Sequence, residues 1–147
     1  MLIANGEEET GKWIEGIVAN LAQSPAGGDT EQLLAIAAGA CDLTMVNTYY
    51  YGRMLASDDK EQREAAAKIG VIWPNKSDRG THVNVSGAGV VKTARNKDNA
   101  IKLIEFLVKP ESQAWYAAVN NEYPVVPGTE ITERLENLGN FKADAIN

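Results

Sequence analysis

The stretch CDLTMVNTYYYGRML, residues 41–55, joins a short apolar run to a helical pattern and so decides the fold. The run at 41–46 is short and apolar enough for a buried strand. Asn47 follows it directly and is a residue type that caps helices, so the aromatic residues after it fall in the first helical turn. A strand that leads straight into a helix indicates an α/β protein.

The same alternation continues along the chain. Further strands are expected at 71–74 and at 81–92, the second of which is rich in β-branched residues and interrupted by glycines. The second helix should begin at Asp29, with Gln32 completing a capping box. Apolar spacing predicts helices at 7–23, 29–40, 47–57, 58–70, 98–109 and 110–121. We therefore predict a single α/β domain over residues 1–147, with three layers and a central mixed sheet flanked by helices.

Composition excludes several classes of protein. The chain has 147 residues and is 44% hydrophobic, which suits one domain with a hydrophobic core. Its formal charge is −6 and its basic residues are scattered, so nucleic acid is not expected as a partner. No apolar run approaches the roughly 20 residues that span a bilayer, and the start MLIANGEEETGKW lacks the basic and apolar regions of a signal peptide.

The three tryptophans are expected to pack in the core.

Three consecutive tyrosines, Tyr49, Tyr50 and Tyr51, stand out at the start of the third helix. Successive helical side chains are about 100° apart, so at most two of the three converge on one point. Arg53 lies four residues after Tyr49 and three after Tyr50, which places it near both. A guanidinium and a helix N-terminus favour the phenolate form, a fitting ligand for ferric iron. The competing interpretation is an aromatic cluster that packs the helix, and spacing alone leaves both open.

Catalysis is not expected. His82 is the only histidine, and no set of nucleophile, base and orienting group accompanies it. A lone histidine in a strand is more often a hydrogen-bonded structural residue than a ligand. The sequence therefore does not predict an enzyme.

Several stretches resemble the ferric-iron-binding proteins of bacterial ABC importers, particularly the cyanobacterial type: CDLTMVNTYYYGRML, RGTHVNVSGAGVVKTA, NAIKLIEFLVKPESQAW and EYPV. The resemblance implies a type II solute-binding fold in the periplasm and an ABC-importer permease as partner. It assigns Fe3+ binding to Tyr49 and Tyr50, anion binding to Asn47, and support of the phenolates to Arg53. Tyr51 falls where that family has another bulky residue and is expected to pack.

The resemblance also implies that residues 1–147 correspond to the C-terminal lobe of a two-lobe protein, with the N-terminal lobe and a C-terminal helical end absent. Two phenolates fill two positions of a six-coordinate ferric centre, so water or an added anion would complete it. The uncovered lobe surface favours self-association, and a homodimer is expected. The alternatives are a lobe that binds another anion or a small organic ligand, and a folded fragment that binds nothing.

Overall fold

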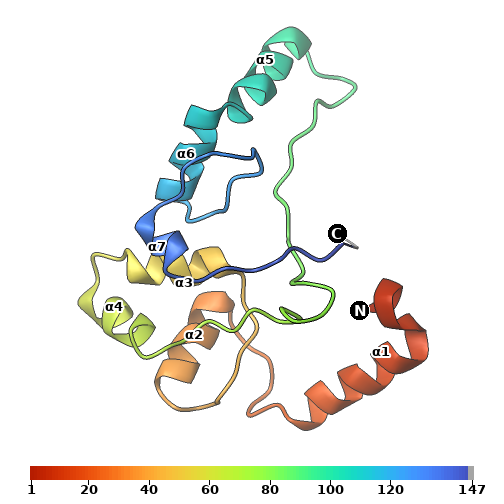
Figure 1. The fold of residues 1–147 in the computed structure, drawn as a ribbon, viewed down its shortest axis with the longest axis vertical. Helices are drawn as coiled ribbons and strands as arrows, with labels where there is room; N and C mark the ends of the chain where they lie inside the picture. The colour runs from red at the N-terminus through yellow and green to blue at the C-terminus, as the bar shows by residue number, and fades with distance from the viewer. Residues whose placement is uncertain (146–147) are drawn as a thin grey trace.

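The computed structural model describes residues 1–145, and this part of the chain contains seven helices connected by extended segments and turns (Figure 1). The helices are α1 (Leu2–Ala19), α2 (Asp29–Ala37), α3 (Thr48–Leu55), α4 (Lys60–Ala66), α5 (Lys97–Leu107), α6 (Pro110–Val119) and α7 (Glu133–Glu136). Every helix expected from the sequence is present. The boundaries move by a few residues, and α1 begins earlier because a helical turn also precedes a kink at Gly6, where φ is 76°.

The start of α2 differs in detail from the prediction. Gly28, and not Asp29, is the residue that precedes the first helical turn. The Glu31 carboxylate accepts a hydrogen bond from the Gly28 N–H at 2.8 Å, so Glu31 takes the part expected of Gln32. The Asp29 side chain is therefore not needed to cap α2, and it contacts another element instead.

The hydrophobic core lies where α2, α3, α4 and α7 meet (Figure 1). Tyr51 and Met54 supply the buried face of α3, and each helix around them contributes a side chain that is almost fully buried. The buried hydrophobic residues are Leu33, Tyr51, Met54, Ala66, Ala117, Leu135 and Leu138. This small core fixes the orientation of α3 and therefore of the tyrosines on it.

The expected central sheet is not formed among residues 1–145. The segments at 41–46, 71–74 and 81–92 are extended but have no strand assignment, and the described pairing is an isolated parallel bridge between Thr81 and Ala143. A strand exists only where a neighbouring segment completes its hydrogen bonds, and no backbone hydrogen bond joins these segments to one another in the described part of the chain. The three-layer description with a central mixed sheet is therefore not confirmed.

The tryptophans also depart from expectation. Trp73 packs against Phe141 with ring centroids 4.5 Å apart and donates its Nε1–H to the Leu138 carbonyl at 2.8 Å. Trp13 on α1 and Trp115 on α6 are 42% and 56% exposed, so the prediction that they pack in the core was wrong for this chain. Their apolar surfaces have no covering element in the described residues.

The first and last parts of the chain are held together through the loop at 79–81. Arg79 forms an ion pair with Asp144 at 3.1 Å and donates a hydrogen bond to Asn5 at 3.2 Å. Gly80 has a φ of 111° and lies so close to the Ala143 carbonyl that a Cβ would come within 2.6 Å of it. Glycine is required here both for the backbone conformation and for the close approach.

Candidate functional site

The candidate site begins at the N-terminus of α3. Asn47 is the capping residue, as predicted, but its side chain makes no capping hydrogen bond. Its backbone N–H instead donates to Asp29 Oδ2 at 2.8 Å, and its Nδ2 lies 3.4 Å from the same oxygen. The Asp29 carboxylate on α2 thus accepts the hydrogen bond of the backbone N–H just before the tyrosines. This contact links the start of α2 to the start of α3.

Tyr49 and Tyr50 come together on one side of α3. Their ring centroids are 4.4 Å apart with an angle of 35° between the planes, and both side chains are half-buried. A hydrogen bond with Tyr50 raises the pKa of Tyr49 above its ordinary value, and burial and the negative charges of Asp29 and Glu122 act in the same direction. In the absence of a cation, Tyr49 is therefore a protonated phenol at neutral pH.

Arg53 lies over the Tyr50 ring, with its guanidinium carbon 5.3 Å from the ring centroid. The sequence places this arginine near both phenols, and the structure shows its contact with Tyr50. The side chain is exposed, so a ligand approaching the two hydroxyl groups would also meet this positive charge.

Tyr51 points elsewhere, as the helical geometry requires. It is only 9% exposed, and its hydroxyl donates to the Ile69 carbonyl at 2.9 Å. Burial raises the pKa of Tyr51. The prediction that Tyr51 is a packing residue is confirmed.

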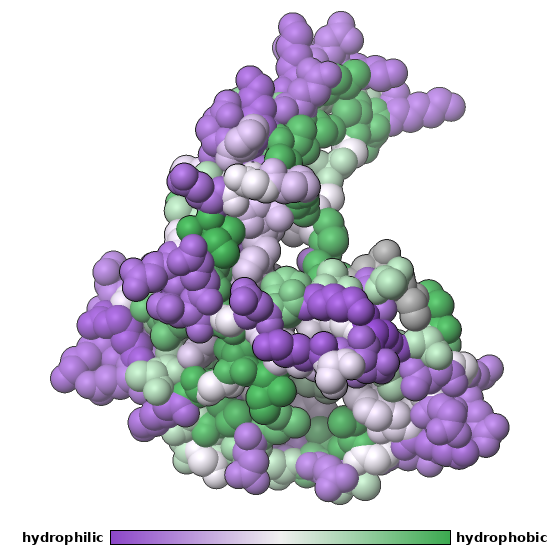
Figure 2. All heavy atoms as spheres, viewed as in Figure 1, coloured by the Kyte–Doolittle hydropathy of each residue, from purple (hydrophilic) through white to green (hydrophobic). Residues whose placement is uncertain are grey.

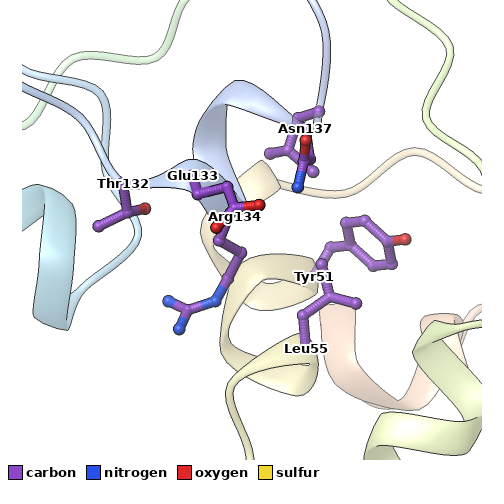
Figure 3. A pocket seen from close by; sticks show the side chains of 7 residues that line it. Tyr51, Leu55, Thr132, Glu133, Arg134 and Asn137 are labelled. Carbon is purple, nitrogen blue, oxygen red and sulfur yellow. The ribbon is translucent and has the colours of Figure 1, made fainter.

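A cavity lies on the Tyr51 side of α3, between α3 and α7 (Figure 3). It has a volume of about 590 Å³ but is wide open to solvent. Figure 3 shows the Arg134 guanidinium directed away from Tyr51, and this group donates to Asn121 Oδ1 at 2.6 Å. Because its charged group is committed to that contact, the cavity is a weaker candidate for ligand binding than the phenol pair.

Residues from distant segments approach the start of α3, and the sequence did not predict their roles. Asn84 donates to Asn47 Oδ1 at 3.4 Å. Ser86 donates to Glu122 at 3.3 Å, and Glu122 is close enough to Tyr49 to affect its pKa. The one available signal was Gly52 within a helical pattern, because a glycine there permits close approach of another segment. That segment is the loop containing Asn121, which lies within 2.7 Å of a Cβ built at Gly52.

The chemistry of this region is that of hard oxygen donors. Among residues 1–145, no group of three or more His, Cys, Asp or Glu side chains is arranged to hold a metal ion. The two phenol oxygens, with acidic side chains nearby, are the donors that suit a hard, highly charged cation. The described helices also include none with the length and apolar character needed to cross a bilayer.

Comparison with known proteins gives a consistent set of relatives. The family model described as bacterial extracellular solute-binding protein matches residues 4–143. Iron uptake protein A1 of Synechocystis sp. is 49% identical over 144 residues, which cover 98% of this chain and 40% of that protein. The major ferric iron-binding protein of Neisseria meningitidis is 29% identical over 96% of this chain. The chain therefore spans less than half the length of the curated relatives it matches.

Solved structures agree in fold. The Trichodesmium protein (IdiA, FutA), determined in complex with iron and citrate ligands, superposes with a TM-score of 0.93 at 45% identity. The match covers 97% of this chain and 45% of that one. The ferric binding protein from Campylobacter jejuni superposes with a TM-score of 0.94 at 35% identity, covering 98% of this chain and 46% of that one. The backbone of residues 1–145 is thus that of part of a type II solute-binding protein, although the central sheet is not formed among these residues.

Proposed function

Because the chain belongs to the family of bacterial extracellular solute-binding proteins, we propose that it is the ferric-iron-binding portion of an ABC-importer receptor. Tyr49 and Tyr50 are the proposed metal ligands. The observation that carries this proposal is the pairing of their rings at 4.4 Å at the start of α3, beside the guanidinium of Arg53. The proteins most similar in sequence and in structure include several that are named for iron uptake or ferric iron binding, which supports Fe3+ as the cargo.

The proposed binding reaction exchanges protons for iron. Each phenol loses its proton when its oxygen coordinates Fe3+, and the hydrogen bond between the two hydroxyls is replaced by two bonds to one cation. The nearby carboxylates of Asp29 and Glu122 disfavour the free phenolate of Tyr49, but they attract a trivalent cation. The same surroundings therefore favour a protonated Tyr49 without iron and a metal-bound phenolate with it.

Two phenolates leave most of a six-coordinate ferric centre open. We propose that water or an added anion, together with groups from outside residues 1–147, completes it. Asn47 lies at the N-terminus of α3, where an anion would be favoured, and Arg53 would balance the charge of the phenolates. The site in this chain alone is expected to be weak.

The receptor would act by capture and release, and not by catalysis. The family is described as extracellular, which supports a location outside the cytoplasmic membrane. We propose a periplasmic receptor that hands its cargo to the membrane permease of the importer.

Ferric titration of the 147-residue chain tests the ligands. Fe3+ supplied with a weak chelator should produce a visible phenolate-to-iron charge-transfer band, because phenolate oxygens donate charge to ferric iron. Tyr49→Phe and Tyr50→Phe should each remove most of this band. Tyr51→Phe is the matched control and should retain it, provided that circular dichroism shows an intact fold.

The outcomes separate the alternatives. A folded protein that stays colourless would contradict iron binding by this chain. Loss of the band in Tyr51→Phe alone would show that the wrong pair was chosen. Binding of citrate or phosphate without iron, abolished by Arg53→Ala, would favour the receptor for another anion. In the iron-binding case, Arg53→Ala should release iron at a lower citrate concentration than Arg53→Lys, which keeps the charge.

A further inference from the structure

The dipeptide Asn5-Gly6 lies at a break in α1. A helical turn precedes it, in which the N–H groups of Ala4 and Asn5 donate to the Met1 carbonyl at 3.0 and 2.9 Å. At Gly6 the backbone leaves the helical conformation, with a φ of 76° and a ψ of 175°. Thr10, which is 4% exposed, donates its hydroxyl hydrogen to the Gly6 carbonyl at 2.6 Å. The buried threonine therefore fixes the position of the break.

An asparagine followed by glycine is chemically labile. The backbone nitrogen of the following residue can attack the side-chain carbonyl carbon of the asparagine, and a glycine nitrogen is the least hindered because glycine has no Cβ. Asn5-Gly6 is the one Asn-Gly pair in the 147 residues. Outside the neighbouring backbone, nothing lies within 4 Å of a Cβ built at Gly6. Other segments therefore leave the nitrogen unobstructed.

Arg79 brings a positive charge to the Asn5 amide. Its Nη1–H donates to Asn5 Oδ1 at 3.2 Å, and its Nε lies 3.1 Å from Asp144 Oδ2. The side chains of Arg79 and Asp144 are 24% and 7% exposed, so the ion pair holds the guanidinium in place. A donor on the amide oxygen stabilises the negative charge that develops there when a nucleophile attacks. The guanidinium thus has the position that would assist attack on Asn5.

Water has access to this dipeptide. Asn5 and Gly6 are both exposed. In Figure 1 the start of α1 lies near the loop at 79–81 and near the end of the described chain, in agreement with the contacts of Arg79. Figure 2 shows hydrophilic residues gathered at the surface where these segments meet. Hydrolysis of an intermediate formed there would not require the protein to open.

We propose that Asn5 is a site of spontaneous deamidation in the folded protein. The Gly6 nitrogen gives up its proton to solvent and bonds to Asn5 Cγ, while the Cγ–Nδ2 bond breaks and ammonia leaves with a proton from solvent. The product is a five-membered succinimide ring. Water then opens this ring at Cγ to give aspartate, or at the main-chain carbonyl carbon to give isoaspartate. Water is the only co-reactant, and the proposal does not depend on iron.

The modification would change how α1 contacts the rest of the molecule. Either product replaces a neutral amide by a carboxylate that faces Arg79 and competes with Asp144 for the guanidinium. Isoaspartate also adds one carbon atom to the main chain before Gly6, which would shift the first turn of α1 against the remainder of the helix. Both products add one negative charge to the formal net charge of −6, so modified and unmodified chains are separable by ion exchange.

Peptide mapping by mass spectrometry tests the site in the folded 147-residue chain, incubated at neutral pH. Asn20, near the other end of α1, is the internal control. It is also exposed, but it precedes Leu21 and donates its Nδ2–H to the Gly16 carbonyl at 2.8 Å. Asn5 should be converted about ten-fold or more faster than Asn20, because the nitrogen that attacks it belongs to glycine. Equal rates at the two asparagines would overturn the proposal.

Two variants test the part assigned to Arg79, because both break the ion pair and only one removes the donor to Asn5. Arg79→Met should slow the conversion of Asn5 about ten-fold. Asp144→Asn is the matched control, since it retains the guanidinium, and it should not slow the conversion. Circular dichroism checks that both variants are folded.

Equal rates of Asn5 conversion in the two variants would overturn the assistance by Arg79. Gly6→Ala is a further variant and should slow the conversion about ten-fold or more, because the added Cβ hinders the attacking nitrogen. An unchanged rate in Gly6→Ala would overturn attack by this nitrogen. The comparison of Asn5 with Asn20 uses the unmodified sequence, so it decides the site even where a substitution prevents folding.

Discussion

Gly52 shows how a single residue sets the geometry of the candidate site. It lies in the middle of α3, where glycine normally weakens a helix. In this helix the missing Cβ makes room for Asn121, which is 1% exposed, has a φ of 59° and is held by Arg134. The loop that follows Asn121 carries Glu122 toward the phenols. Gly52 therefore lowers the intrinsic stability of α3, but it allows the loop containing Asn121 to pack closely against the helix.

We predict that Gly52→Ala destabilises the protein by about 1–3 kcal/mol, although alanine is the better helix former. The added Cβ would come within 2.7 Å of the Asn121 side chain, which is buried and hydrogen-bonded and so has little freedom to move. Gly16→Ala on α1 is the matched control, because nothing lies within 4 Å of its built Cβ. It should stabilise by up to about 1 kcal/mol. Chemical denaturation measures both, and equal effects would contradict the close packing at Gly52.

Tyr51 predicts a pH dependence at alkaline pH. Burial raises its pKa in the folded protein above the unfolded value of about 10, so the unfolded chain loses this proton first. The stabilising contribution is complete below pH 10 and is lost as pH rises through the folded pKa, so the free energy of unfolding should fall over that range. Tyr123, whose pKa burial also raises, should contribute in the same direction.

Tyr51→Phe should cost about 1 kcal/mol at neutral pH, because the hydrogen bond to the Ile69 carbonyl is lost. It should also flatten the alkaline decrease in stability. Denaturation curves between pH 7 and pH 11 measure both effects. An alkaline decrease equal to that of the unmodified chain would exclude Tyr51 as its source.

At the scale of elements, local patterns predicted the helices well. Pro110 begins α6 as expected. The 100° rotation between helical residues indicated that at most two of the three tyrosines converge, and the resemblance assigned Tyr51 to packing, where the structure finds it. Strands were harder, because a strand depends on a neighbour that local sequence does not contain. The segment at 81–92 has the residues of a strand, yet its pairing in residues 1–145 is limited to the bridge at Thr81. The sequence predicted the conformation of this segment and could not supply its partner.

In the candidate site too, contacts within one helix were predictable from the sequence, and contacts between distant segments were not. The contact of Arg53 with Tyr50 arises within one helix and followed from spacing, whereas the choice of Tyr49 and Tyr50 as the pair came from the resemblance. The approach of Glu122 and Asn84 arises from segments far away in the sequence, and no local pattern indicates it. The exposed positions of Trp13 and Trp115 were missed for a related reason. Their residue type predicts burial, but no element among residues 1–145 covers them.

For the whole molecule, the large accessible area predicts an unusual heat capacity of unfolding. Globular proteins gain about 12–15 cal/mol/K per residue, which amounts to about 2 kcal/mol/K for a chain of 147 residues. The chain buries about a fifth less surface than a typical monomer of its mass, given its accessible area of 10721 Å². We expect a heat-capacity change of about 1.6 kcal/mol/K.

Differential scanning calorimetry of the dilute 147-residue chain measures this change. A value at or above about 2 kcal/mol/K would show that α5 and α6 fold back onto the other helices in solution or that the chain associates.

The contacts of the extended segment 83–90 with Asn47 and Glu122 connect the proposed metal site to residues far away in the sequence. Asn84 and Ser86 lie on this segment, and they donate hydrogen bonds to Asn47 and Glu122 respectively. Fixing the segment therefore reduces the freedom of groups near the phenols. By linkage, whatever factor an ordered segment adds to the affinity for iron, bound iron adds to the equilibrium that orders the segment.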